Sequence, residues 1–120
     1  MWTVEQTRNA ARRRLAKETR RQTALEERRA EAREYAYTLA RTIGDEDDTV
    51  RKIWGFGSVF DRRLPFRSYS DIDLAVLGGT TKAWKISQAS PWKVDWIELD
   101  LQADSMVRAI VESGVLLYER

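Results

Sequence analysis

The sequence contains no cysteine and no histidine. Without cysteine, disulfide bonds and thiolate metal sites are excluded, and without histidine there is neither zinc–imidazole chemistry nor histidine-based acid–base catalysis. A metal bound by this chain must have oxygen ligands, which favours hard cations such as magnesium, manganese or calcium. No apolar run approaches the roughly 20 residues that cross a bilayer, and the start of the chain lacks the apolar segment of a signal peptide. We expect a cytoplasmic protein with no membrane segment.

The 120 residues provide for one modest domain. The formal net charge is only +2, but the positive excess lies in residues 1–41, where eleven Lys and Arg oppose six Asp and Glu. Such a basic arm binds nucleic acid or an acidic partner in some proteins and is a solvated helix face in others. The cations of residues 12–21 wrap around most of a helix, so a dedicated nucleic-acid stripe is not expected. Salt-sensitive RNA binding by this arm stays an alternative.

Proline and glycine are absent between Val4 and Ile43, and Ala, Arg, Glu, Leu and Lys dominate this stretch. These residues favour helix, so one long helix or two are predicted. Apolar residues are sparse up to Arg33 and then recur with spacings of three and four, so only the last two or three turns are expected to pack on a domain. The first 30 residues are predicted to project towards a partner, a second copy or solvent. Gly44 is predicted to end the helix, with an acidic loop after it.

Short apolar segments follow, and their length and their β-branched or aromatic content are typical of strands. They are RKIWGFGSVF, DIDLAVLGG, KVDWIELDL and, near the end, VLLYE. A helix capped by Thr80 or Thr81 is predicted after the second segment, and another between Ala103 and Ser113, with Gly114 behind it. The predicted fold class is α/β (α+β): a small mixed sheet with helices packed on it, preceded by a long N-terminal helix.

Asp71 and Asp73 interrupt an otherwise apolar predicted strand. Because side chains alternate along a strand, both carboxylates are expected on one face, about 6 to 7 Å apart. Such a pair is costly to bury unless a cation lies between the two carboxylates. If the next strand lies alongside, Asp95 joins them, and three carboxylates on one face form an oxygen cage suited to magnesium. Glu98 or Asp100 would be the third carboxylate if the strand register differs.

The Gly57-Ser58 pair upstream points to the same chemistry. Glycine at a strand end lets the backbone approach a ligand closely, and the following residues can open a helix whose N–H groups favour phosphate. The Ser58 hydroxyl is a candidate ligand of a γ-phosphate, and Arg62, Arg63 or Arg67 is a candidate for neutralising the leaving pyrophosphate. Without such neighbours, the aspartates would fit a solvated edge strand and the glycine-serine pair an ordinary turn.

Together these residues resemble the minimal nucleotidyltransferase signature of the DNA polymerase beta superfamily, in which GS is followed by SDIDL and later by a third aspartate. Here GS stands at 57–58, SDIDL at 70–74 and the third aspartate at 95. The resemblance covers about residues 50–120. The expected division is therefore a long charged helical extension over residues 1–43 and a minimal nucleotidyltransferase domain over 44–120.

The resemblance implies an enzyme that transfers a nucleoside monophosphate, usually AMP from ATP, to a hydroxyl. It implies that Asp71 and Asp73 bind two Mg²⁺ ions, as in other two-metal phosphoryl-transfer sites. Asp95 would help to bind one of the ions and act toward a general base. Gly57 and Ser58 would hold the triphosphate.

The sequence departs from this family at one cationic position. Many members carry an arginine three residues after the serine and a small residue before it, whereas here Asp61 and Phe60 stand at these positions. Arg62 or Arg63 is expected to replace the arginine through a shifted turn. A catalytically decayed protein that neutralises a partner by binding alone is the alternative that this departure keeps open.

The family also implies a partner. Minimal nucleotidyltransferases typically pair with a separate helical HEPN protein, and several pairs are toxin–antitoxin systems in which the nucleotidyltransferase is the antitoxin and adenylylates a tyrosine of the toxin. The resemblance therefore implies an antitoxin and protein adenylyltransferase with a HEPN partner. The projecting helix is a candidate docking element for that partner or for a second copy of the chain.

Overall fold

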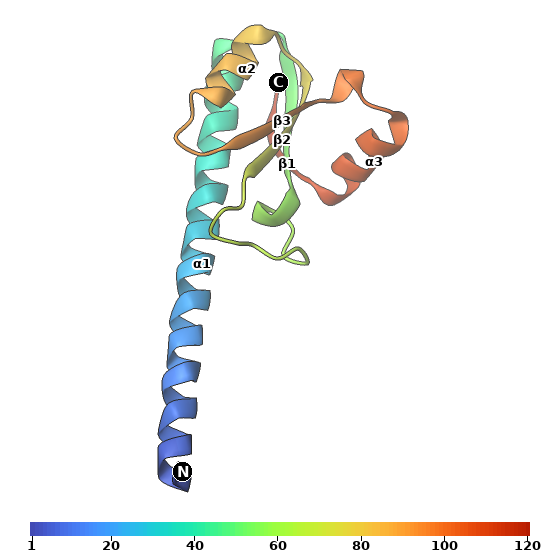
Figure 1. The fold of residues 1–120 in the computed structure, drawn as a ribbon. Coiled ribbons are helices and arrows are strands. Elements are labelled where there is room, and N and C mark those ends of the chain that lie inside the picture. Colours follow the sequence, from blue (N-terminus) through green and yellow to red (C-terminus); the bar gives the residue numbers. More distant parts are fainter.

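A computed structural model describes all residues from Met1 to Arg120. Figure 1 shows a small sheet between helices, with α1 and α2 on one side, α3 on the other, and much of α1 extending away from the body. Single turns of 3₁₀ helix follow the first and third strands. This arrangement confirms the predicted fold class. The elements in chain order are α1 (Val4–Glu46), β1 (Val50–Phe56), β2 (Ile72–Gly78), α2 (Thr81–Gln88), β3 (Val94–Glu98), α3 (Asp104–Ser113) and β4 (Val115–Glu119).

The four strands form one mixed sheet in the order β3-β2-β1-β4. β1 is antiparallel to both of its neighbours, whereas β2 and β3 are parallel. α2 provides the crossover that joins the parallel pair, as parallel strands require. The beginnings of β2 and β3 therefore lie side by side, at the end of the sheet where β1 finishes.

α1 is one continuous helix of 43 residues, the simpler of the two predicted alternatives. It begins with a capping box, in which the Thr3 hydroxyl accepts a hydrogen bond from the Gln6 N–H and the Gln6 side chain accepts one from the Thr3 N–H. The prediction that Gly44 ends the helix is wrong, because α1 continues to Glu46. Gly44 is instead buried against the ring of Tyr118, and a β-carbon at this position would overlap that ring.

The acidic segment after Gly44 is not the predicted loop. Its first residues form the last turn of α1, and its third, Asp47, is a buried residue that connects the end of α1 to the start of α2. Asp47 ends the helix and is only 4% exposed. One of its carboxylate oxygens accepts hydrogen bonds from the N–H and hydroxyl of Thr49, and the other from the N–H and hydroxyl of Thr80, the cap of α2. Burial alone would raise the pKa of Asp47, but these four hydrogen bonds hold it well below its usual range.

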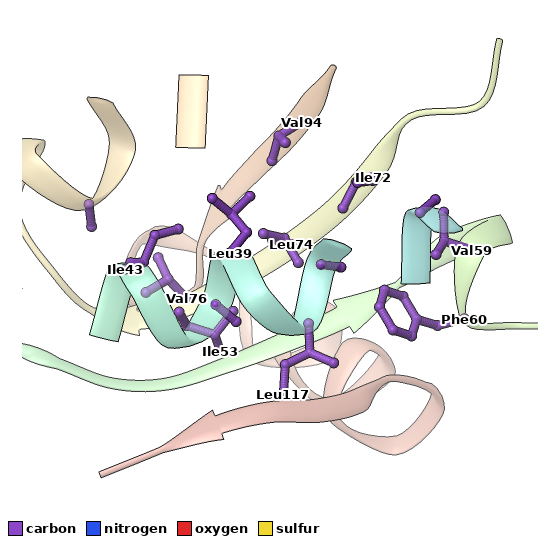
Figure 2. Close-up of a cluster of buried hydrophobic side chains, with 14 of the residues drawn as sticks. Leu39, Ile43, Ile53, Val59, Phe60, Ile72, Leu74, Val76, Val94 and Leu117 are labelled. Atoms are coloured by element: carbon purple, nitrogen blue, oxygen red, sulfur yellow. The ribbon is translucent and has the colours of Figure 1, made fainter. Parts of the chain in front are cut away.

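The main core lies between α1 and one face of the sheet (Figure 2). Leu39 and Ile43 of α1 meet Ile72, Leu74 and Val76, which alternate along β2 and are fully or almost fully buried. Small alanine side chains between the larger ones let the helix lie close to the strands. Burying each leucine or isoleucine is worth roughly 1.5 to 3 kcal/mol, so this face holds the inner half of α1 on the domain.

The opposite face of the sheet has a smaller core beneath α3. Trp54 of β1, Ala75 of β2 and Ile110 of α3 are buried there. Because β2 alternates its side chains, its odd-numbered residues, Asp73 among them, belong to this face.

The outer part of α1 has no buried side chain before Arg29, so the start of the chain projects. The projecting part is shorter than the 30 residues predicted, because Glu26, Arg28 and Arg29 already contact the loop between β1 and β2. The molecule consequently measures 67 × 29 × 19 Å. Despite its length, α1 is too polar to span a bilayer, and neither of the other helices qualifies.

Candidate active site

The candidate site lies where β1 ends and β2 and β3 begin. Phe56, the last residue of β1, pairs with Asp73 of β2, and Asp73 pairs on its other side with Asp95 of β3. The turn that starts at Gly57 therefore stands beside Asp73, although the residues are far apart in sequence. This convergence follows from the topology, since β1 runs into the turn while the parallel pair runs away from it.

Asp73 and Asp95 occupy matching positions in adjacent parallel strands. Residues in register on neighbouring strands point to the same face, so the two carboxylates are neighbours on the α3 side of the sheet. Asp95, and neither Glu98 nor Asp100, is brought beside Asp73: Glu98 pairs with Val76 farther along the strand, and Asp100 accepts a hydrogen bond from the N–H of Gly78 at the far end.

Asp71 precedes β2 instead of lying inside it, because the strand begins at Ile72. The expectation that Asp71 and Asp73 share one regular strand is therefore corrected by one residue. The Asp71 carboxylate lies 3.6 Å from the ammonium of Lys93, whose side chain is 82% exposed. This ion pair is weak because the lysine is so exposed, and it leaves the carboxylate accessible to a stronger cation.

The electrostatics of Asp73 reflect its neighbours. Burial raises the pKa of Asp73 to about 6, with the negative charges of Asp95 and Asp71 adding to the effect. A carboxylate is perturbed in this way when other carboxylates are near and no cation offsets them. The three aspartates thus concentrate negative charge at one end of the sheet.

Gly57 allows the turn to approach Asp73. Its φ of +73° lies in the left-handed region that side chains disfavour. In addition, a β-carbon on Gly57 would overlap the Oδ2 atom of Asp73. The glycine is therefore needed twice, for its backbone conformation and for the space that the carboxylate occupies.

The two arginines expected to hold the triphosphate are engaged elsewhere. Arg63 forms an ion pair of 2.9 Å with Asp61, and Arg62 lies 3.6 Å from Glu26 of α1. Both arginine side chains are more than three-quarters exposed, so these pairs are readily exchanged for other anions. Asp61, which occupies the usual arginine position, has its pKa lowered by hydrogen bonds from Arg63.

The donor set of the site suits a hard divalent cation. All three acidic side chains offer oxygen ligands, and their mutual repulsion would be relieved by positive charge between them. No three carboxylates are close enough in this structure to ligate one ion together, so Asp71 would have to shift toward the Asp73–Asp95 pair.

A cleft of about 440 Å³ opens beside Asp71, lined in part by Ser70, Trp92 and Lys93. Arg28 of α1 lies over the Trp92 ring, with its guanidinium carbon 4.4 Å from the ring centre. This cleft has room for part of a nucleotide or for an acceptor side chain next to Asp71, whereas Asp73 and Asp95 do not line it.

α1 contributes to this region in a way that was not predicted from the sequence. Arg28 and Arg29 both donate hydrogen bonds to the chain segment that carries the site. A signal was present for Arg29, which precedes Ala32 and Ala36 at the same spacings of three and four that mark the buried stripe of the helix. A charged residue on a buried stripe is unusual enough to suggest a specific role.

No protein-family model and no curated protein matches this sequence. Solved structures do match. A crystal structure of a toxin–antitoxin with AMP-PNP aligns at 22% identity over 70% of this chain and 73% of the other, with a TM-score of 0.56. A mutant of the toxin–antitoxin MntA–HpeT aligns at 23% identity over 73% of each chain, with a TM-score of 0.54. This chain therefore shares its fold with a chain of such toxin–antitoxin complexes.

Proposed function

We propose that this protein is a magnesium-dependent nucleotidyltransferase, which transfers AMP or another nucleoside monophosphate from a triphosphate to a hydroxyl group. The observation that carries the proposal is the register of Asp73 with Asp95, beside a glycine whose missing side chain makes room for the Asp73 carboxylate. A solvated edge strand needs none of these features. The fold shared with toxin–antitoxin chains, one of them solved with AMP-PNP, supports the same reading.

In this proposal Asp71 and Asp73 would hold two Mg²⁺ ions, and Asp95 would help to bind one of them. The ions would supply positive charge to the triphosphate and to the attacking oxygen. Gly57 brings the backbone close to the phosphates, and the Ser58 hydroxyl donates a hydrogen bond to the terminal phosphate.

The reaction forms one bond and breaks one. The acceptor oxygen attacks the α-phosphorus, the bond between that phosphorus and the bridging oxygen breaks, and pyrophosphate leaves. Asp95 accepts the proton of the hydroxyl as the new bond forms. Arg62 and Arg63 neutralise the departing pyrophosphate by exchanging their present carboxylate partners, Glu26 and Asp61, for phosphate oxygens.

The proposed acceptor is a tyrosine of a HEPN-type toxin, so that the chain acts as an antitoxin and a protein adenylyltransferase. The toxin–antitoxin complexes that share its fold favour a partner protein as the source of the acceptor.

Titration of magnesium and ATP into the protein, followed by thermal unfolding, tests the proposal. We expect ATP to raise the unfolding temperature only with magnesium, and the double variant Asp71→Asn with Asp73→Asn to lose this response. The double variant Asp45→Asn with Asp48→Asn removes two exposed carboxylates and is the matched control. Loss of the response in the control, or its survival in the site variant, would contradict the assignment of the site.

A second candidate function is neutralisation of a partner by binding alone. The ion pairs of Arg62 and Arg63 favour it, because both arginines already have carboxylate partners in the free protein. This candidate predicts no response to ATP, and partner affinity that the site variant leaves unchanged. Comparison of the wild type with the Asp71→Asn and Asp73→Asn double variant therefore distinguishes the enzyme hypothesis from the binding hypothesis.

A further inference from the structure

Two adjacent arginines of α1 hold the two ends of the loop between β1 and β2. The Nε of Arg29 donates a hydrogen bond of 2.9 Å to the carbonyl oxygen of Ser58, and the Nε of Arg28 donates one of 3.1 Å to the carbonyl oxygen of Ser68. Both acceptors belong to the main chain, so these bonds fix the path of the backbone. One lies in the glycine-serine turn and the other shortly before Asp71.

The loop has few other polar attachments. Apart from these two bonds and the pair between Arg62 and Glu26, the hydrogen bonds and ion pairs of residues 58–70 join residues no more than four positions apart. All three distant attachments end on α1. The helix is therefore the polar support of the loop that leads from the turn to the first aspartate.

The burial of Arg29 shows that this support is not incidental. The residue is only 4% exposed, and its Nη2 atom is buried without a hydrogen-bond acceptor. Burial lowers the pKa of Arg29, and the positive charges of Arg62 and Arg33 add to this effect. An apolar residue would cost less at such a position, because a buried cation loses hydration that one hydrogen bond does not replace.

We propose that Arg29 and Arg28 are positioning residues for the nucleotide, which keep the Gly57-Ser58 turn and the approach to Asp71 in the arrangement that receives a triphosphate. The inference rests on the proposed function and deepens it. Neither arginine has to touch the reacting atoms, since each acts through a main-chain carbonyl. The buried charge of Arg29 also lies directly behind the turn, where positive potential favours a bound anion. α1 is then a part of the nucleotide site.

The test compares Arg29→Met and Arg28→Gln with Arg20→Gln, which removes an exposed cation of α1 that makes no ion pair or side-chain hydrogen bond. Hydrogen exchange of residues 58–70 is measured in the free proteins, and calorimetry measures the Kd for AMP-PNP with magnesium. Because a hydrogen bond to a charged group is worth a factor of about ten or more, we expect exchange to accelerate and the Kd to rise by about tenfold in the two site variants. Arg20→Gln should behave as wild type.

The outcomes separate this inference from the proposed function. Unchanged exchange in both variants overturns the bracing role, and faster exchange with an unchanged Kd overturns the positioning role while leaving the enzyme intact. If the wild-type protein itself does not bind AMP-PNP, the proposed function fails and the nucleotide role of the arginines fails with it. Should Arg29→Met not fold, the exposed Arg28→Gln decides alone, and Arg29→Lys shows whether charge without the guanidinium geometry suffices.

Discussion

Replacing Asp73 with asparagine should stabilise the metal-free protein. The wild-type carboxylate is partly buried beside Asp95 and near Asp71, and its pKa is raised to about 6. Asparagine has nearly the same shape and no charge, so it removes the repulsion without opening a cavity. A metal-binding role predicts a carboxylate that lowers the stability of the metal-free protein.

The size of the effect follows from the pKa. A rise from 3.8 to about 6 corresponds to about 3 kcal/mol at neutral pH, and partial exposure of the carboxylate to solvent reduces this to about 1 to 2 kcal/mol. The sign follows from proton binding: between these two values the folded protein binds more protons than the unfolded chain. The free energy of unfolding of the wild type therefore falls as the pH rises through this window, and the Asp73→Asn variant lacks this fall.

Urea unfolding followed by tryptophan fluorescence, in the presence of EDTA, measures the difference. We expect the variant to match the wild type near about pH 4 and to exceed it by about 1 to 2 kcal/mol at about pH 7.5. Asp48→Asn, at an exposed position, controls for the loss of one negative charge. With magnesium and ATP present, the wild type should become more stable than Asp73→Asn, because ligand binding stabilises only the wild type.

One result would refute this reasoning. If Asp73→Asn is no more stable than Asp48→Asn at about pH 7.5, burial of the Asp73 carboxylate beside Asp95 and Asp71 does not carry the free-energy cost that its raised pKa implies. The proposed metal site would then lose its main electrostatic support.

Three further changes test other parts of the structure. Gly44→Ala should lower the free energy of unfolding by about 1 to 3 kcal/mol, because the new methyl group meets the Tyr118 ring, although alanine favours helix. In urea unfolding, the double variant with Tyr118→Leu should recover much of this loss. Asp47→Ala should cost about 1 to 3 kcal/mol at neutral pH, since it removes the acceptor of four hydrogen bonds from Thr49 and Thr80. The cost should shrink below about pH 4, because stability from a lowered pKa is present above the unfolded value and is lost as the pH falls toward the folded one; thermal unfolding across pH detects this. Gly57→Ala should cost about 1 to 2 kcal/mol from its backbone conformation and displace Asp73, so calorimetry should find no magnesium-dependent ATP binding.

Local sequence patterns predicted most of the fold. Strand alternation and helix periodicity depend on neighbouring residues, so the strands and the two short helices follow from the sequence, and of the two predicted caps, Thr80 and Thr81, the structure has Thr80. The sequence predicted that Asp95 would lie on the same face as Asp73, but it left the register open between Asp95, Glu98 and Asp100, and the structure pairs Asp73 with Asp95.

The features that the sequence did not reveal depend on distant partners. Gly44 has the appearance of a helix stop until the Tyr118 ring is placed against it. Asp47 belongs to an acidic run that normally marks a solvated loop, and its hydrogen bonds with Thr80, which lies 33 residues away, explain why it is buried. Arg29 is one of many arginines in the helix; its place on the buried stripe marks it, but its hydrogen-bond partner, the Ser58 carbonyl, lies 29 residues away in the sequence.

α1 passes without a break from its free turns to the turns that contact the loop between β1 and β2. The free part, residues 4–20, is about 25 Å long at a rise of about 1.5 Å per residue. A continuous helix of this kind is rigid, so a protein that binds its free end and tilts it would also displace Arg28 and Arg29, which contact the loop. Binding of a partner at the free end of α1 would then be coupled to the position of the loop, because the helix has no break between the two.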